Sequence, residues 1–222
     1  MLKFLVNDNK PTVLVITPLR VGDTVSRSTK ISIKRTGASL LWVSWEGPEN
    51  VAKNTQDCYD FMKRHNDVAF RTLKYIIKID NDIESSRNMI DKMVQTLESS
   101  KDNVGYTYCD FVYVGAVNQK FIALPFSIEK LCRCNYISSN SMLKIKTLDL
   151  VNGFVVDDKY KRLLDWAMWL KMYTFGFVGV PTSNTSFVAH TSKDSVSAGG
   201  QDDYVLKHYN VTEDFVNPIR NR

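Results

Sequence analysis

The sequence lacks the features that mark membrane and secreted proteins. No apolar run reaches the roughly 18 to 20 residues that a membrane-spanning helix needs, and the opening stretch from Met1 to Asp8 is too short for a secretory signal peptide. The four cysteines have none of the spacings of a disulfide framework, so we expect all of them to be reduced thiols. Together these absences predict a cytoplasmic protein without a transmembrane segment.

Several familiar catalytic motifs are also missing. The sequence contains no G-x-S-x-G, no G-x-x-x-x-G-K-[ST] and no G-x-G-x-x-G, which excludes the simplest hydrolases, P-loop proteins and dinucleotide-binding proteins. There are only three histidines, so a zinc site with several histidine ligands is not expected.

What the sequence does contain is an ordinary globular composition with a basic balance. A chain of 222 residues, 44% of them hydrophobic and 24% charged, is long enough for one substantial core and short for two. The net charge of +5 makes phosphate-rich partners plausible, whether nucleotides, nucleic acid or an anionic membrane surface, without choosing among them.

The order of periodic segments predicts an α/β fold. We expect strands at 12–17, 40–44, 75–79 and 105–114, separated by helices at about 23–34, 54–62 and 89–97. This alternation is typical of a central, mostly parallel sheet with helices on both faces. Further on, a helix is expected from Tyr160 to Met172 and a short strand from Gly176 to Pro181, with no confident structure in the tail.

Two carboxylates end one of the predicted strands. Asp80 and Asp82, separated by Asn81, follow the apolar run that starts at Tyr75. Ligands of open α/β sheets bind at such strand ends. Mg²⁺ and Mn²⁺ take one or two carboxylates and complete their shell with water and phosphate oxygens. The alternative is an ordinary helix cap or a chance triplet.

Two earlier strand ends carry further polar groups. Thr17, Pro18 and Arg20 follow the first strand, where backbone groups and a guanidinium can meet a base or phosphates. Glu46 follows the second strand and can accept hydrogen bonds from a ribose or a base. Because the ends of parallel strands share one edge, a single nucleotide could contact all three places.

A fourth candidate lies in the late helix. Asp165 is flanked by leucines and by Trp166, and partial burial would raise its pKa toward that of a useful base. The alternative is a surface acid on an amphipathic helix. Trp166 and Trp169 are either core residues or platforms for a sugar ring. His190 stands in an expected loop near the end of the chain, from which it could reach the metal edge.

Taken in order, these motifs resemble a family-two-like glycosyltransferase with the GT-A fold, of the D-x-D, nucleotide-sugar-dependent type. The resemblance runs from Val13 to about Ser197. It includes the Thr17–Pro18 loop, Ile79 to Asp82, Asn152-Gly153-Phe154, Leu164 to Lys171, and His190 ahead of Ser195-Val-Ser197.

The resemblance implies roles for these residues. It implies a single domain over 1–222, with 11–115 binding the nucleotide-sugar, 116–198 binding the acceptor, and 199–222 as a tail. Asp82 would contact Mn²⁺ or Mg²⁺, with Asp80 on the metal, its water or the ribose, and His190 on the metal or diphosphate. Thr17, Pro18, Arg20, Glu46, Asp80 and Asn81 would contact the donor, and Asn135, Trp166 and Trp169 the acceptor. Asp165 would be the general base, although Leu164 stands where the family has a glutamate.

The implied reaction is the inverting transfer of a sugar from a nucleoside-diphosphate donor, with uridine as the first choice of base. The acceptor would be a hydroxyl of a glycan or lipid-linked saccharide, or a hydroxylated DNA base as in phage-type DNA glucosylation. In the DNA case Arg133, Asn135, Lys144 and Lys146 could contact phosphates. The rival functions are a metal-dependent nucleotidyltransferase and a non-catalytic nucleotide-binding domain.

Overall fold

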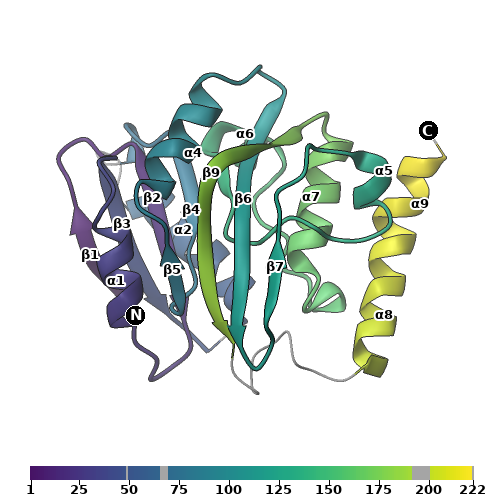
Figure 1. Cartoon of the computed structure of the whole chain (residues 1–222), viewed down its shortest axis with the longest axis horizontal. Coiled ribbons are helices and arrows are strands. Elements are labelled where there is room, and N and C mark those ends of the chain that lie inside the picture. The colour runs from purple at the N-terminus through teal and green to yellow at the C-terminus, as the bar shows by residue number, and fades with distance from the viewer. Residues whose placement is uncertain (49, 66–69, 192–200, 222) are drawn as a thin grey trace.

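A computed structural model describes the backbone of residues 1–48, 50–65, 70–191 and 201–221 (Figure 1). Its strands are β1 (Leu2–Asn7), β2 (Val13–Leu19), β3 (Leu40–Glu46), β4 (Tyr75–Lys78), β5 (Ile83–Ser85), β6 (Val104–Gly115), β7 (Gln119–Phe121), β8 (Met142–Lys144) and β9 (Val178–Thr191). Its helices are α1 (Arg27–Ile33), α2 (Val51–His65), α4 (Met89–Glu98), α5 (Ile128–Leu131), α6 (Ile145–Leu150), α7 (Leu164–Thr174), α8 (Gln201–Val211) and α9 (Asn217–Arg220). A 3₁₀ turn, η1 (Asp158–Tyr160), and a π-helical turn, η3 (Thr212–Val216), complete the described elements.

The described strands form one mixed sheet. Their order is β1-β3-β2-β4-β8-β6-β9-β5, and β7 pairs with β6. β3, β2 and β4 are parallel to one another, as are β6 and β9, whereas the remaining pairs are antiparallel. The pairing of β2, β3 and β4 is the parallel pairing that the alternating pattern predicted, because a crossover through a helix returns the chain in the same direction. β6, the fourth strand of that pattern, is separated from them by the antiparallel β8 and is parallel to β9 instead.

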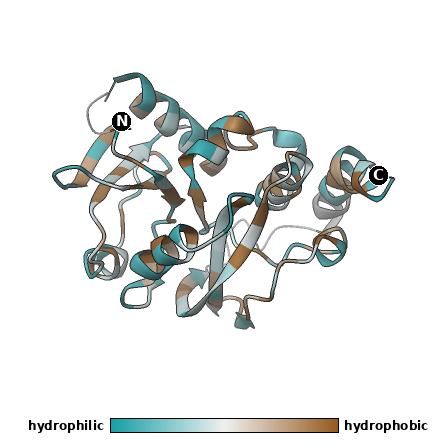
Figure 2. Cartoon of the chain, turned by 90° about the horizontal axis from the view of Figure 1, so that it is seen from above, coloured by the Kyte–Doolittle hydropathy of each residue, from teal (hydrophilic) through white to brown (hydrophobic). Residues whose placement is uncertain are grey.

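Both faces of the sheet are covered, which confirms the predicted α/β class. One apolar cluster joins Ile16 and Ile76 to α2 and α7, and the other joins Val15 and Ile77 to α1 and α4. Successive residues of a strand point to opposite faces, so each strand contributes to both clusters. Seen from above, the hydrophobic strands lie between the helices (Figure 2).

Two helix starts differ from the sequence-based expectation. α1 begins at Arg27, later than the expected residue 23. Ser26 is its N-cap, and the Ser26 hydroxyl accepts a hydrogen bond from the Thr29 N–H at 3.0 Å. α7 begins at Leu164 and not at Tyr160. Arg162, with φ of +76°, lies in the left-handed region and separates η1 from α7.

The last part of the chain is more regular than expected. The strand predicted at 176–181 continues to Thr191, because it pairs with both β5 and the long β6. Helices α8 and α9 lie beside α7 in Figure 1, where Val211 and Val216 are buried. The structure thus assigns helices to a tail for which the sequence supported no prediction. Ser195-Val-Ser197 lies outside the described residues.

No helix in the described parts of the chain is long and apolar enough to cross a membrane.

Candidate active site

The three predicted strand ends lie at one edge of the sheet. β2 and β3 are in register up to Leu19 and Glu46, and β4 stops at Lys78, which lies opposite Ile16. The Ile79 N–H continues the pairing with a 2.9 Å hydrogen bond to the Ile16 carbonyl. Asp80 therefore follows at the level where β2 and β3 end.

Thr17 and Pro18 are at this edge but are buried. The Thr17 hydroxyl is fully buried and accepts a 3.0 Å hydrogen bond from Trp42 Nε1. The alternation of the strand points Thr17 to the face that holds Trp42. The Thr17 side chain thus supports the strands beneath the edge, and the expected contact of this stretch with a donor through its backbone groups stays a prediction.

Glu46 and Arg20 are nearer to solvent. Glu46 Oε1 accepts a 3.0 Å hydrogen bond from the Gly22 N–H, which ties the end of β3 to the loop after β2. Arg20 is exposed in that loop. A carboxylate and a guanidinium at neighbouring strand ends leave groups for hydrogen bonding to a nucleotide.

Asp80 is held by two neighbours. Lys78 Nζ lies 2.6 Å from Asp80 Oδ1 and 2.8 Å from Oδ2. The buried Asn140 accepts a 3.1 Å hydrogen bond from the Asp80 N–H and donates one to Oδ2 at 3.2 Å. A carboxylate with both oxygens engaged is a poorer metal ligand than an open one, so Asp80 is better suited to anchoring the loop.

Asn81 contributes through its backbone. Its carbonyl accepts a 3.1 Å hydrogen bond from the Ser26 N–H and a 3.0 Å bond from the Thr29 hydroxyl. The start of α1 thereby fixes the turn between the two carboxylates.

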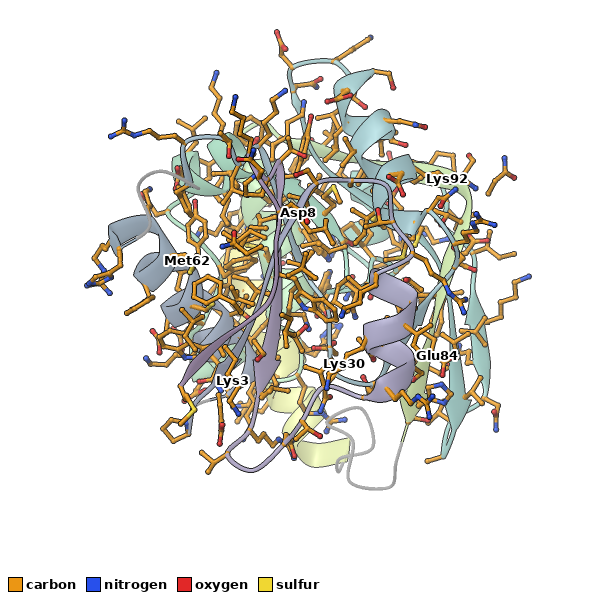
Figure 3. All side chains as sticks on the ribbon, turned by 90° about the vertical axis from the view of Figure 1, so that its left-hand side faces the viewer. Lys3, Asp8, Lys30, Met62, Glu84 and Lys92 are labelled. Atoms are coloured by element: carbon orange, nitrogen blue, oxygen red, sulfur yellow. The ribbon has the colours of Figure 1, made fainter. Side chains whose placement is uncertain are left out.

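Asp82 and His190 are brought together by the pairing of β5 with β9. The His190 N–H donates to the Asp82 carbonyl at 3.3 Å, and His190 Nε2 lies 3.1 Å from Glu84 Oε1. His190 therefore belongs to a strand and not to the loop expected from the sequence. Figure 3 shows Glu84 at this margin of the molecule, next to α1.

The pKa of Asp82 is raised above its usual value. Partial burial is the main cause and the neighbouring Asp80 carboxylate adds to it, while the Asp82 backbone, Lys78 and His190 act in the opposite direction. The positive charges of Lys78 and His190 offset the repulsion between Asp80 and Asp82 only in part. A bound cation would relieve the rest.

These residues fit a divalent cation whose coordination shell is completed by phosphate oxygens of a bound nucleotide. No three His, Cys, Asp or Glu side chains in the described ranges are grouped as a ready-made metal cage. Asp82 and His190 supply oxygen and nitrogen donors, which suits Mn²⁺ or Mg²⁺ bound through few protein ligands and phosphate oxygens.

Asp165 lies in the first turn of α7, partly buried. Burial raises its pKa to about 6. The Trp166 N–H, which donates to Asp165 Oδ1 at 2.9 Å, the positive charge of Lys78 and a hydrogen bond from Asn135 oppose this rise. A carboxylate with a pKa near neutrality can take a proton and release it again.

Lys78 connects the Asp80–Asp82 strand end with Asp165. Its ammonium group bonds to Asp80 and its charge also acts on Asp82 and Asp165. Three carboxylates against one ammonium leave two negative charges in excess, which one divalent cation would cancel. Asn135 is placed against Asp165 by its side-chain hydrogen bond.

The two tryptophans of α7 are core residues. Trp166 and Trp169 are 1% and 2% exposed. Their ring N–H groups donate to the Leu131 carbonyl at 2.7 Å and the Ile137 carbonyl at 3.1 Å, and Trp169 stacks on Tyr106. The proposal that either ring supports a sugar is therefore wrong, because neither presents a face to solvent.

Lys78 and Asn140 were missed by the sequence-based reasoning. Lys78 was visible as a lysine inside an otherwise apolar run, where a buried ammonium needs an acidic partner. Asn140 gave no such signal, since it stands in a polar stretch that reads as a loop.

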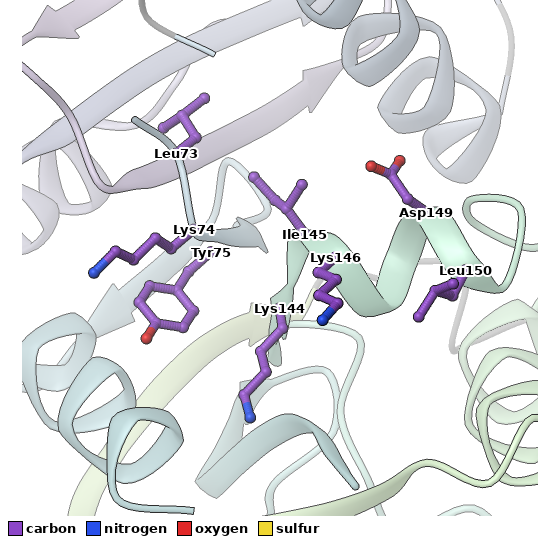
Figure 4. Close-up of a pocket in the computed structure, with 8 residues that line it drawn as sticks. All are labelled: Leu73, Lys74, Tyr75, Lys144, Ile145, Lys146, Asp149 and Leu150. Atoms are coloured by element: carbon purple, nitrogen blue, oxygen red, sulfur yellow. The ribbon is translucent and has the colours of Figure 1, made fainter. Parts of the chain in front are cut away.

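Lys144 and Lys146 lie elsewhere. With Leu73, Lys74, Tyr75, Ile145, Asp149 and Leu150 they line an open hollow of about 630 Å³ (Figure 4). Tyr75 begins β4 and pairs with Lys144, so this hollow lies at the opposite end of β4 from Asp80. Lys144 and Lys146 are thus not grouped with Asp80 and Asp82.

Known proteins are similar to this chain in fold but not in sequence. No family model matches the chain, and no curated protein matches it. Among solved structures, S. aureus TarS residues 1–349 in complex with UDP-GlcNAc matches 88% of this chain with a TM-score of 0.57 and 11% identity. The chain therefore shares the fold of this structure.

A second match is the mannosyltransferase PcManGT from Pyrobaculum calidifontis in complex with GDP-Man and Mn²⁺, with a TM-score of 0.52, 14% identity and 88% of this chain covered. The chain spans 64% of the TarS 1–349 structure, 62% of the mannosyltransferase and 38% of a longer TarS structure.

Proposed function

We propose that this protein is a metal-dependent glycosyltransferase that moves a sugar from a nucleoside-diphosphate donor to an acceptor hydroxyl. The observation that carries the proposal is that one ammonium group, bonded to Asp80, links the Asp80–Asp82 strand end to Asp165 through its charge. The charge of Lys78 acts on all three acids, although α7 and β4 are far apart in the sequence. The glycosyltransferase fold and the ligands of its structural neighbours support the same function.

The two ends of the site would do different work. The end of β4 would hold the donor, with Asp82 and His190 toward the metal and Asp80 and Asn81 shaping the loop. A bound Mn²⁺ or Mg²⁺ would neutralise the charge that develops on the leaving diphosphate. Arg20 and Glu46 would contact the nucleoside from the neighbouring strand ends.

Asp165 would act on the acceptor. As a general base it takes the proton of the attacking hydroxyl while the sugar is attacked on the face opposite the leaving group, which inverts the anomeric carbon. Asn135 would keep the Asp165 carboxylate oriented. This division assigns 11–115 to the donor and 116–198 to catalysis and the acceptor within a single domain over 1–222, with 199–222 as its tail.

The base of the donor and the chemical class of the acceptor complete the proposed reaction. Uridine is the first choice of base, and structural neighbours with UDP-GlcNAc and with GDP-Man make a comparison of uridine with guanosine donors the natural test. The acceptor would be a saccharide, or a hydroxylated base in DNA if the basic surface engages phosphates. The four free thiols suit a reducing compartment such as the cytoplasm.

Thermal unfolding with UDP- and GDP-sugars, with and without Mn²⁺, tests donor binding. A donor at about 100 times its Kd stabilises the folded state by about 2.7 kcal/mol, which raises Tm by roughly 5–10 °C for a chain of this size. The shift should require Mn²⁺, disappear in Asp82→Asn, and persist in Asp57→Asn, which removes an exposed acid on α2.

Product analysis then tests the reaction. With saccharide and hydroxylated DNA acceptors, a nucleoside diphosphate should be released together with a glycosylated product. Release of pyrophosphate would identify a nucleotidyltransferase instead, and donor binding without turnover on either acceptor would favour a binding domain.

A further inference from the structure

We propose that Lys78 is a positioning residue of the transfer site, whose ammonium group anchors the Asp80 carboxylate and presents positive charge to Asp165 across the site. The inference rests on the proposed function, and it adds to it a residue outside the D-x-D triplet and outside the motif around Asp165.

The location of Lys78 is the first step. Lys78 is the last residue of β4, and the alternation of that strand places it on the same face as Ile76, which packs in the cluster that contains α7. Its side chain is 12% exposed. A nearly buried ammonium must be balanced by acids to remain charged without a large cost.

The contacts of Lys78 are the second step. Both oxygens of Asp80 lie within 2.8 Å of Nζ, and Asn140 completes the clamp on the Asp80 carboxylate and N–H. This arrangement occupies Asp80, which leaves Asp82 as the carboxylate better placed to meet a metal. Because Lys78 holds Asp80 and not Asp82, the two aspartates would have different roles: Asp80 anchors the loop and Asp82 binds the metal.

The third step concerns Asp165. The groups that act on Asp165 from other elements are Lys78, at the end of β4, and Asn135, in the segment before β8. His208 of α8 packs on the neighbouring Trp166, with 4.9 Å between the ring centroids. The charge of Lys78 opposes the effect of burial on Asp165, and so favours the ionised form that a general base requires. If Asp80 cancelled the charge of Lys78 completely, the pair would have little effect on Asp165.

The test compares Lys78→Met, Lys78→Arg and, as a control, Lys53→Met, which removes a lysine that pairs with Asp57 at 3.1 Å on the surface of α2. The readout is the titration of the Asp165 carboxyl carbon by NMR, assigned with Asp165→Asn and followed from pH 4 to 9 without nucleotide or metal. The Asp165 pKa should rise by about one unit in Lys78→Met and stay within a few tenths of wild type in Lys78→Arg and Lys53→Met.

Transfer rates give the second readout. The acid limb of the profile of kcat against pH should move upward by the same amount in Lys78→Met, so that kcat near pH 6 falls about fivefold, and Lys78→Arg should recover most of it. An unmoved Asp165 titration in Lys78→Met, or equal damage by methionine and arginine, would overturn the inference.

Lys78→Met leaves the Asp80 carboxylate without its positive partner, and this variant can fail to fold. A second pair of variants covers that case. Asp80→Asn is compared with Asp80→Asn/Lys78→Met, which contains no orphaned carboxylate, and the Asp165 pKa should be higher in the double variant. If wild-type protein transfers no sugar while this titration moves as expected, the proposed function fails, the role of Lys78 in transfer fails with it, and only the effect of the Lys78 charge on Asp165 stands.

Discussion

Asp165→Asn should stabilise the protein at neutral pH while it abolishes sugar transfer. Burial raises the Asp165 pKa from 3.8 to about 6. Between these two values the unfolded chain has released the proton and the folded chain still binds it, so the free energy of unfolding falls as pH rises. The stability that the protonated acid provides is complete below pH 3.8 and is lost as pH rises through about 6.

The size of the effect follows from the shift. About two pKa units correspond to about 3 kcal/mol, and contact of the partly exposed carboxylate with solvent reduces the expected gain to about 2 kcal/mol. Asparagine keeps an oxygen that can accept the hydrogen bond from the Trp166 N–H. For a chain of this size the Tm of Asp165→Asn should exceed that of wild type by roughly 4–8 °C at pH 8.

The assay is thermal unfolding of wild type and Asp165→Asn from pH 4 to 9, with Asp57→Asn as a control for the loss of one exposed negative charge. The difference between wild type and Asp165→Asn should be small at pH 4, grow up to about pH 6 and level off above it. A difference that does not change with pH would refute the account of Asp165 as an acid destabilised by burial. Retention of full transfer activity in Asp165→Asn would separately refute its role as the base.

The remaining predictions concern the metal edge and the core. Asp82→Asn should remove the Mn²⁺-dependent part of the rise in Tm that the donor causes. An unchanged affinity for Mn²⁺ in calorimetric titration with donor present would contradict the assignment of Asp82 as a metal ligand. His190→Gln should weaken Mn²⁺ binding in the presence of donor about tenfold, whereas equal affinity would restrict His190 to its contact with Glu84. Trp169→Ala should lower the free energy of unfolding by about 3–5 kcal/mol in denaturant titration and leave the KM for acceptor unchanged; a selective rise in that KM would restore a binding role for the ring.

Local pattern was sufficient for much of the fold. The strands at β2, β3, β4 and β6 and the helices between them were predicted because apolar periodicity and turn residues are properties of short segments. The C-terminal strand was predicted only over 176–181, because the rest of β9 depends on pairing with β5 and β6. The helices of the tail were not predicted, because they depend on packing against α7. The α7 tryptophans show the same limit: their residue type allowed a core or a surface role, and only the packing decided between them.

For the candidate site, the sequence by itself determined that two acids follow a buried strand and that a third lies in a helix of large apolar residues. The tertiary structure alone decided that Lys78 bonds to Asp80 while its charge acts on Asp82 and Asp165, that Asn140 clamps Asp80, and that His190 lies beside Asp82 through the pairing of β5 with β9. The physical reason is that the period of a strand or helix is written in neighbouring residues, whereas the partner of a buried charge is set by which distant segments pack together.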